Sequence, residues 1–194
     1  MLRRFLGLAQ VKNTYRYIDT QRVYEILRTV LFFGVSIALF LGGYQATGSR
    51  NNLLTVVAVL GCLPASKSMV SAIMFCRFHS ASEQVHQAAA PFDETQDTLY
   101  DLVFTTQKVN YSVAHCCLIG NELVLLTEDK KLDKKGLESH LNEMFKKAGL
   151  GKVNIGIFTE IRRYTDRLNT LIKGEREEYK DAALLIETLR EITL

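Results

Sequence analysis

Four side chains that could bind a metal ion follow one another at helical spacing near the middle of the chain: Cys76, His79, Glu83 and His86. Steps of three, four and three residues place them on one face of a continuous helix. Thiolate, imidazole and carboxylate groups are ligands for zinc or iron. Because this stripe is about 15 Å long, a site would also need a partner helix or a second protomer. The alternative is a polar, solvated helix face, and no cofactor is predicted from the stripe alone.

The candidate catalytic residues are acidic. Asp97 and Asp101 belong to an expected first strand, and the Glu-x-Lys sequence from Glu128 to Lys130 follows an expected third strand. A helix, three antiparallel strands, a helix and a strand is similar to the element order of the PD-(D/E)xK nuclease core, in which an Asp and a Glu-x-Lys hold a divalent metal. The expected second strand, residues 111–119, has no acidic residue. The element order fits this enzyme class, whereas the metal ligands do not.

A histidine beside two cysteines raises the question of a nucleophile and its base. Neighbouring strand residues point to opposite faces, so His115 shares a face with Cys117 and not with Cys116. The sequence shows no nearby Asp or Asn that would orient the imidazole. We therefore expect a buried strand with small, reduced thiols, because no cysteine pair has the spacing of a zinc site.

Two long apolar segments indicate where the chain lies. Residues 29–49 carry no charge, and residues 51–76 carry only Lys67. A helix of about 20 apolar residues crosses a bilayer core about 30 Å thick. The sequence therefore predicts a transmembrane helical hairpin with spans of about 29–47 and 53–75. A cleaved signal peptide is disfavoured because a second apolar segment follows the first at once.

Small residues recur along both predicted spans, which allows helices to pack closely within the chain or between protomers of a homo-oligomer. These candidate packing residues are Gly34, Ala38 and Gly42 on the first span and Ala58, Gly61 and Ala65 on the second. Pro64 predicts a kink. Lys67 is expected to extend its side chain to the membrane surface, and the alternative is a functional lysine inside an oligomeric pore.

Charge is distributed unevenly along the chain. Residues 1–28 contain six Lys and Arg against two Asp and Glu, a net charge of +4, whereas residues 77–194 contain 16 against 19, a net charge of −3. The excess of cations before the first span places both termini in the cytoplasm. The negative C-terminal part makes nucleic acid an improbable partner. A cluster of cations in residues 162–173 is expected to be an ordinary solvated helix face.

The predicted organisation has four parts. A basic amphipathic segment (1–28) precedes the hairpin (29–76), and a juxtamembrane helix (77–91) continues the second span until Pro91. A cytosolic α+β domain (92–194) follows. Its expected order is β-β-β-α-β-α-α with a mixed or antiparallel sheet: strands at 99–105, 111–119, 122–127 and 153–158, a helix after Asp133, and helices at about 161–172 and 175–192.

This organisation favours a membrane-anchored interaction or regulatory module over an enzyme. Its expected partners are the lipid bilayer, a second copy of the chain and a protein whose identity the sequence does not give. One alternative is a membrane-bound enzyme with a nuclease-like core, either active or degenerate. The other is an oligomeric pore or transport component in which Lys67 faces the interior.

Overall fold

The computed structural model describes residues 12–106, 109–174 and 179–194 of the 194-residue chain. The described residues form two compact units. One is a helical hairpin, residues 18–79, and the other combines residues 12–17 with the chain from Ser80 onward. We call the second unit the α+β domain. It begins earlier than the expected boundary at residue 92 and includes the end of the predicted N-terminal segment, of which residues 1–11 lie outside the described residues.

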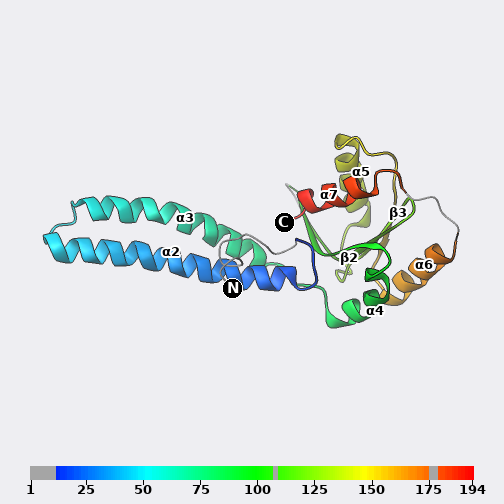
Figure 1. Cartoon of the computed structure of the whole chain (residues 1–194), viewed down its shortest axis with the longest axis horizontal. Helices are drawn as coiled ribbons and strands as arrows, with labels where there is room; N and C mark the ends of the chain where they lie inside the picture. Colours follow the sequence, from blue (N-terminus) through cyan, green and yellow to red (C-terminus); the bar gives the residue numbers. More distant parts are fainter. Residues whose placement is uncertain (1–11, 107–108, 175–178) are drawn as a thin grey trace. The chain divides into compact units, whose positions relative to one another are not determined.

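The hairpin consists of α2 (Tyr17–Thr47) and α3 (Leu53–Cys76), which run side by side (Figure 1). Both helices are long and apolar enough to cross a membrane. The Asn52 side chain accepts a hydrogen bond from the amide of Thr55 at 2.8 Å and thereby caps α3. Pro64 lies inside α3, which continues past it. The apolar spans expected from the sequence are therefore helical, and α2 begins well before the first of them.

The helices of the hairpin pack through different residues from those expected on α2. On α3, the small residues Ala58 and Ala65 are buried within the hairpin. On α2, the candidate packing residues are exposed, so their packing between protomers stays a prediction: Gly34, Ala38 and Gly42. Beyond Tyr17 and Ile18 at its start, the buried positions of α2 are Glu25, Ser36 and Gly43, whose spacings of 11 and 7 residues correspond to whole numbers of turns.

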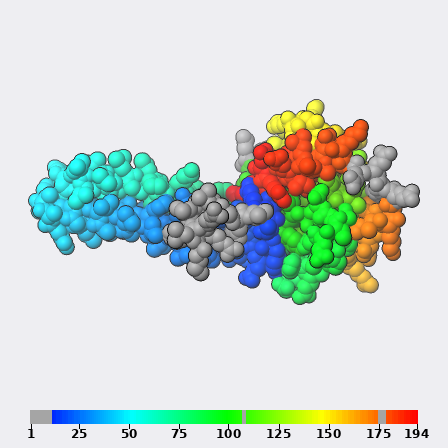
Figure 2. Space-filling view, viewed as in Figure 1, coloured from blue at the N-terminus to red at the C-terminus, as the bar shows by residue number. Residues whose placement is uncertain are grey.

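The two helices approach each other closely at Gly61 of α3 and Gly43 of α2, which explains which face of α2 is buried. A Cβ on Gly61 would lie 2.7 Å from the Ser36 hydroxyl oxygen, and one on Gly43 would lie 2.7 Å from the Leu54 Cβ. A Cβ on Gly34 or Gly42 would meet nothing within 4 Å. The two helices lie against each other in the space-filling view (Figure 2). Packing of the outer α2 stripe against a second protomer stays a prediction.

The α+β domain contains a four-stranded mixed sheet with the order β1-β2-β3-β4. Strands β1 (Asp97–Thr105), β2 (Asn110–Ile119) and β3 (Glu122–Leu126) form an antiparallel meander, and β4 (Asn154–Phe158) lies parallel to β3. Gly120 occupies the tight turn between β2 and β3 with a φ of 56°. Helix α5 (Lys134–Lys147) connects β3 to β4. The expected element order is therefore confirmed.

Helices cover both faces of the sheet (Figure 1). On one face, α5 and α7 (Ala182–Ile192) enclose an apolar core. On the other, α4 (Glu83–Asp93) and α6 (Ile161–Lys173) enclose a second core. The central strands are buried on both sides, which explains why β3 reads as a continuous apolar run rather than an alternating one.

The expected continuous helix from the second span to Ala90 was wrong. Helix α3 ends at Cys76, and α4 begins only after Ser82, whose hydroxyl accepts a hydrogen bond from the Val85 amide. Ser82 is therefore the N-cap of α4, a position that serine favours because its hydroxyl satisfies a free amide of the first turn. Pro91 does not end α4, because so close to the C-terminus of the helix it removes only one internal hydrogen bond. Helix α4 therefore continues two residues past Pro91, to Asp93.

Candidate functional site

A hydrogen-bonded network of four side chains lies on the sheet face that α4 and α6 cover. Asp93, at the end of α4, accepts a hydrogen bond from the Tyr100 hydroxyl of β1 at 2.6 Å. The other carboxylate oxygen of Asp93 lies 3.3 Å from Nε2 of His115 on β2. The Nδ1 atom of His115 lies 2.6 Å from the Tyr164 hydroxyl of α6. The network therefore joins two helices and two strands.

The protonation states in this network follow from burial and hydrogen bonding. Burial lowers the pKa of His115, and its hydrogen bond to Asp93 offsets only part of that effect. For Asp93, burial by itself would raise the pKa, but hydrogen bonds from His115, Tyr100 and Thr98 outweigh it and the pKa is lowered. Burial raises the pKa of both Tyr100 and Tyr164. A neutral His115 that donates through Nε2 to ionised Asp93 and accepts through Nδ1 from Tyr164 satisfies all these groups.

The network extends to the surface of the domain. Nδ1 of His86 on α4 lies 3.2 Å from the Tyr100 hydroxyl, and the His86 ring stacks on Tyr15, with centroids 3.9 Å apart. The Tyr15 hydroxyl donates a hydrogen bond to Glu83 at 2.7 Å. Since Tyr15 precedes the hairpin and α4 follows it, this outer part joins the two chain segments that flank the hairpin.

Burial limits what this arrangement can do chemically. His115 and Tyr164 have no exposed surface, so a substrate cannot contact the imidazole or the phenol. Throughout the described part of the chain, no buried side-chain nitrogen or oxygen lacks a hydrogen-bond partner. The groups have the types of an acid–base relay, but their geometry positions α4 and α6 on the sheet rather than presenting a reactive atom.

Asp101 has a structural task of its own in the middle of β1. Its φ is 55°, in the left-handed region that aspartate tolerates better than most residues, and it is 3% exposed. One of its carboxylate oxygens accepts a hydrogen bond from the Ala81 amide at 2.7 Å. The irregular backbone at Asp101 also shifts the alternation of side chains along β1 by one residue. Leu99 and Leu102, three residues apart, therefore lie in the same core.

The expected acidic residues do not converge. Glu128 accepts a hydrogen bond from the Ser82 amide at 3.2 Å, next to the Asp101 contact, and Lys130 is exposed. Asp97 lies four residues before Asp101, or about 13 Å along the strand. The structure therefore brings Asp101 and Glu128 to the start of α4 as hydrogen-bond acceptors, whereas Asp97 lies elsewhere.

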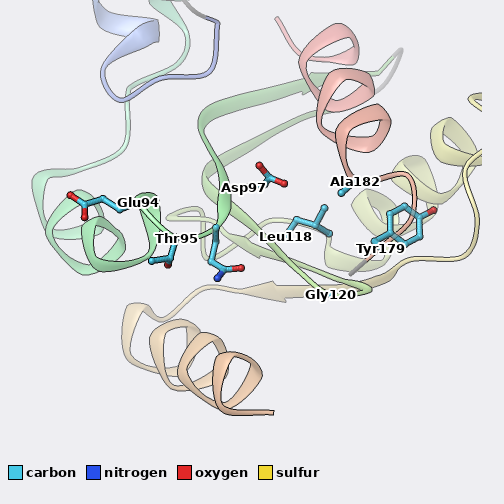
Figure 3. A pocket seen from close by; sticks show the side chains of 8 residues that line it. Glu94, Thr95, Asp97, Leu118, Gly120, Tyr179 and Ala182 are labelled. Atoms are coloured by element: carbon cyan, nitrogen blue, oxygen red, sulfur yellow. The ribbon is translucent and has the colours of Figure 1, made fainter. Parts of the chain in front are cut away.

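Asp97 lines a hollow that begins at the C-terminal end of α4. This hollow of about 380 Å³ lies between the start of β1 and the segment leading into α7 (Figure 3). Figure 3 shows Asp97 and Leu118 between Thr95 on one side and Tyr179 on the other. A second hollow, of about 870 Å³, shares Asp97 and Ala182 and continues along α7. No histidine or cysteine lines either hollow.

The metal-ligand stripe is not assembled either. Within the described ranges, no group of three or more His, Cys, Asp or Glu side chains could hold a metal ion. Cys76 ends α3, while Glu83 and His86 belong to a separate helix and contact Tyr15. The stripe depended on one uninterrupted helix, and the break between Cys76 and Glu83 removes that premise.

Two of the four cations of α6, Arg163 and Arg167, form ion pairs with glutamates. Arg167 forms two hydrogen bonds with Glu122, Nε to Oε1 at 2.8 Å and Nη2 to Oε2 at 2.7 Å. Arg163 pairs with Glu160 at 2.9 Å. The Glu122 side chain is 9% exposed, so its pair with Arg167 fastens α6 to the start of β3. Arg162 and Lys173 are exposed, and the expectation of an ordinary solvated helix face stays a prediction.

The fold and the network define a protein class: a helical hairpin joined to an α+β domain with a mixed sheet. No family model matches this chain, and comparisons with curated proteins and with solved structures found no match either. The arrangement of the chain's own residues is therefore the basis for a functional proposal.

Sequence reasoning found His115 but missed its partners. Asp93 and Tyr164 are 22 and 49 residues away from His115 along the chain, and only the packing of α4 and α6 on the sheet brings them together. The available signal was a lone histidine in an otherwise apolar strand, which in a folded domain requires polar partners.

Proposed function

We propose that this protein is an integral membrane protein in which α2 and α3 span the bilayer and the α+β domain acts as an interaction or regulatory module in the cytoplasm. The observation that carries this proposal is the exposure of apolar side chains along the hairpin. In the most apolar 18-residue windows of α2 and α3, only 11% and 17% of the residues are buried. A core helix of a water-soluble protein would bury most of such a window.

Nearly all exposed large apolar side chains of the described chain belong to these two helices. Burial of a Val, Leu or Ile side chain stabilises a protein by about 1.5–3 kcal/mol, so leaving so many in water would be costly. A bilayer provides the apolar surroundings they need. Examples that are more than half exposed are Val23, Leu27, Val30, Val35, Ile37, Leu41, Leu53, Val56, Val59, Leu60, Leu63 and Val70.

The distribution of cations supports the orientation. Arg16, Arg22 and Arg28 lie near the start of α2, and Arg77 follows α3, whereas the turn between the helices contains Arg50 alone. Cations flanking membrane helices are retained on the cytoplasmic side. Both connections to the α+β domain therefore emerge in the cytoplasm.

A role as a module, rather than as a passive anchor, is supported by the way the domain holds both connections. The carbonyl oxygen of Asn13, before the hairpin, accepts a hydrogen bond from the Tyr100 amide at 2.9 Å. Ala81, after the hairpin, binds the neighbouring residue Asp101. Adjacent positions of β1 thus fasten both connections, so that binding of a partner to the domain can be transmitted to the chain entering the membrane.

The experiment is membrane extraction combined with thiol labelling in intact cells. We expect the full chain to remain in the membrane at alkaline pH and to be released only by detergent. In a variant with Cys62 and Cys76 replaced by serine, Ser49→Cys in the turn should react with an impermeant maleimide, whereas Lys173→Cys on α6 should react only after lysis.

Each part of the proposal can fail separately. Release by alkaline carbonate would overturn membrane insertion. Labelling of Lys173→Cys in intact cells, with Ser49→Cys protected, would reverse the orientation. The buried thiols Cys116 and Cys117 do not complicate the assay, because burial raises the pKa of both, that of Cys117 to about 12.

A further inference from the structure

We propose that Lys67, supported by Arg28, binds the phosphate headgroup of an anionic phospholipid at the cytoplasmic surface of the bilayer. This inference rests on the proposed insertion of the hairpin. It goes further by fixing the depth of Lys67 and by naming the chemistry that its ammonium group meets.

A polar contact between the helices sets their alignment. The Ser68 hydroxyl lies 2.9 Å from a carboxylate oxygen of Glu25 and 3.4 Å from the Glu25 backbone oxygen. Lys67 is one residue closer to the turn and is therefore level with Glu25 and Arg28, at the inner end of the charged part of α2. A residue level with charged side chains lies toward the edge of a bilayer and not at its centre.

The distance to the turn agrees with this depth. At the other end of the hairpin, Gly43 packs against Leu54. From Glu25 to Gly43 the helix rises by about 27 Å, and from Leu54 to Ser68 by about 21 Å. Both lengths are somewhat shorter than a hydrocarbon core of about 30 Å. The backbone of Lys67 therefore lies just inside the cytoplasmic edge of the apolar core, and its long side chain extends to the headgroup layer.

The surroundings of Lys67 leave its charge available. Its side chain is exposed on the outside of the hairpin. The carboxylates at this level have other partners, since Asp19 pairs with Arg22 at 2.9 Å and Glu25 with Arg28 at 3.7 Å. Among the described residues, no ion pair includes Lys67. An outward-facing ammonium group at the membrane surface, with no protein carboxylate to pair with, is suited to a lipid phosphate.

Arg28, three residues after Glu25 on α2, is a second cation near this level of the hairpin. Its side chain is 44% exposed, and its guanidinium carbon lies 5.4 Å from the centre of the Phe32 ring. The ring orients the guanidinium group, whose charge is partly balanced by its pair with Glu25 at 3.7 Å. Exposed Met69, Val70 and Ile73 continue α3 beyond Lys67, and this mixture of cationic and apolar side chains is typical of a membrane surface.

The test uses the full chain reconstituted into nanodiscs that contain phosphatidylcholine with about one-third phosphatidylglycerol. The measured quantity is the enrichment of phosphatidylglycerol among the lipids that remain bound to the protein after a detergent wash, relative to the starting mixture. We expect wild-type enrichment, and a loss of about fivefold in anionic-lipid binding in Lys67→Gln. Lys67→Arg should retain the enrichment.

Matched controls separate this site from general attraction. Arg50→Gln in the turn and Lys173→Gln in the α+β domain remove the same charge elsewhere and should leave the enrichment unchanged. Equal enrichment in Lys67→Gln and the wild type, or none in the wild type, would overturn the lipid site while leaving membrane insertion intact. Failure of the wild-type chain to enter nanodiscs would instead overturn the membrane proposal.

Discussion

Tyr15 and His86 lie on opposite sides of the hairpin in the sequence, yet their rings stack with centroids 3.9 Å apart and planes 8° apart. This contact lies entirely within the α+β domain. This stacked pair is connected to the buried network, because His86 Nδ1 lies within hydrogen-bonding distance of the Tyr100 hydroxyl, which donates a hydrogen bond to Asp93. The domain therefore holds the chain before and after the hairpin at one place and connects that place to its buried network.

Asp101 is expected to stabilise the domain through its hydrogen bond to the Ala81 amide. Asp101→Ala leaves that amide without its acceptor and places alanine at a φ of 55°, which together should cost about 2–4 kcal/mol. Asp101→Asn keeps a side-chain oxygen and tolerance of this backbone, so it should cost less than half as much. Urea unfolding of the full chain in detergent, followed by near-ultraviolet circular dichroism, measures both. Asp97→Ala in the same strand should change stability by less than about 0.5 kcal/mol, and an equal loss there would contradict the assignment.

The buried imidazole of His115 predicts a pH dependence of stability. Because burial lowers its pKa in the folded state, the unfolded chain binds more protons once the pH falls below about 6.5. Stability contributed by neutral His115 is complete above this pH and decreases as the pH falls further. The wild-type urea midpoint should drop between pH 7.5 and pH 5, and His115→Gln should flatten that drop. His140→Gln on α5 is the control and should follow the wild type; parallel curves for His115→Gln and the wild type would refute the prediction.

The ion pair between Arg167 and Glu122 is expected to contribute to the stability of the domain. Arg167→Met leaves the nearly buried Glu122 carboxylate without its two hydrogen bonds and should lower stability by about 1–3 kcal/mol. Arg167→Lys should recover only part of this loss, because an ammonium group cannot form the two parallel bonds. The double variant Arg167→Met/Glu122→Met removes both charges and should be more stable than Arg167→Met alone. If the double variant were less stable, the unpaired carboxylate would not be the cause.

The hairpin contact predicts different effects for two glycines. Gly61→Leu places a branched side chain where a Cβ is already 2.7 Å from Ser36, so the helices must separate. Gly34→Leu, at a position with nothing within 4 Å of its Cβ, should leave the hairpin intact. Thermal aggregation of the full chain in detergent should begin at a clearly lower temperature for Gly61→Leu only. The oligomeric state of Gly34→Leu, measured on the same sample, tests whether the outer α2 stripe contacts a second protomer.

Local pattern was enough to predict most elements. The apolar segments became α2 and α3, and the strands fall within two residues of their expected bounds. The Gly120-Asn121 turn and the start of α5 after Asp133 also lie where the residues indicated, although the Asp133 side chain forms no capping hydrogen bond. These features depend on the spacing of side chains over a few residues, which the sequence displays directly.

Tertiary structure decided the rest. The sequence could not show that the chain breaks between Cys76 and Glu83, because Asp101, 20 residues from Ala81, holds the break in place. It could not choose the face of α2, since a helix with small residues on several faces packs on the one that its partner complements. The partners of His115 were hidden for the same reason: a buried polar group needs hydrogen bonds, but which distant residues supply them is determined only when helices and strands pack together.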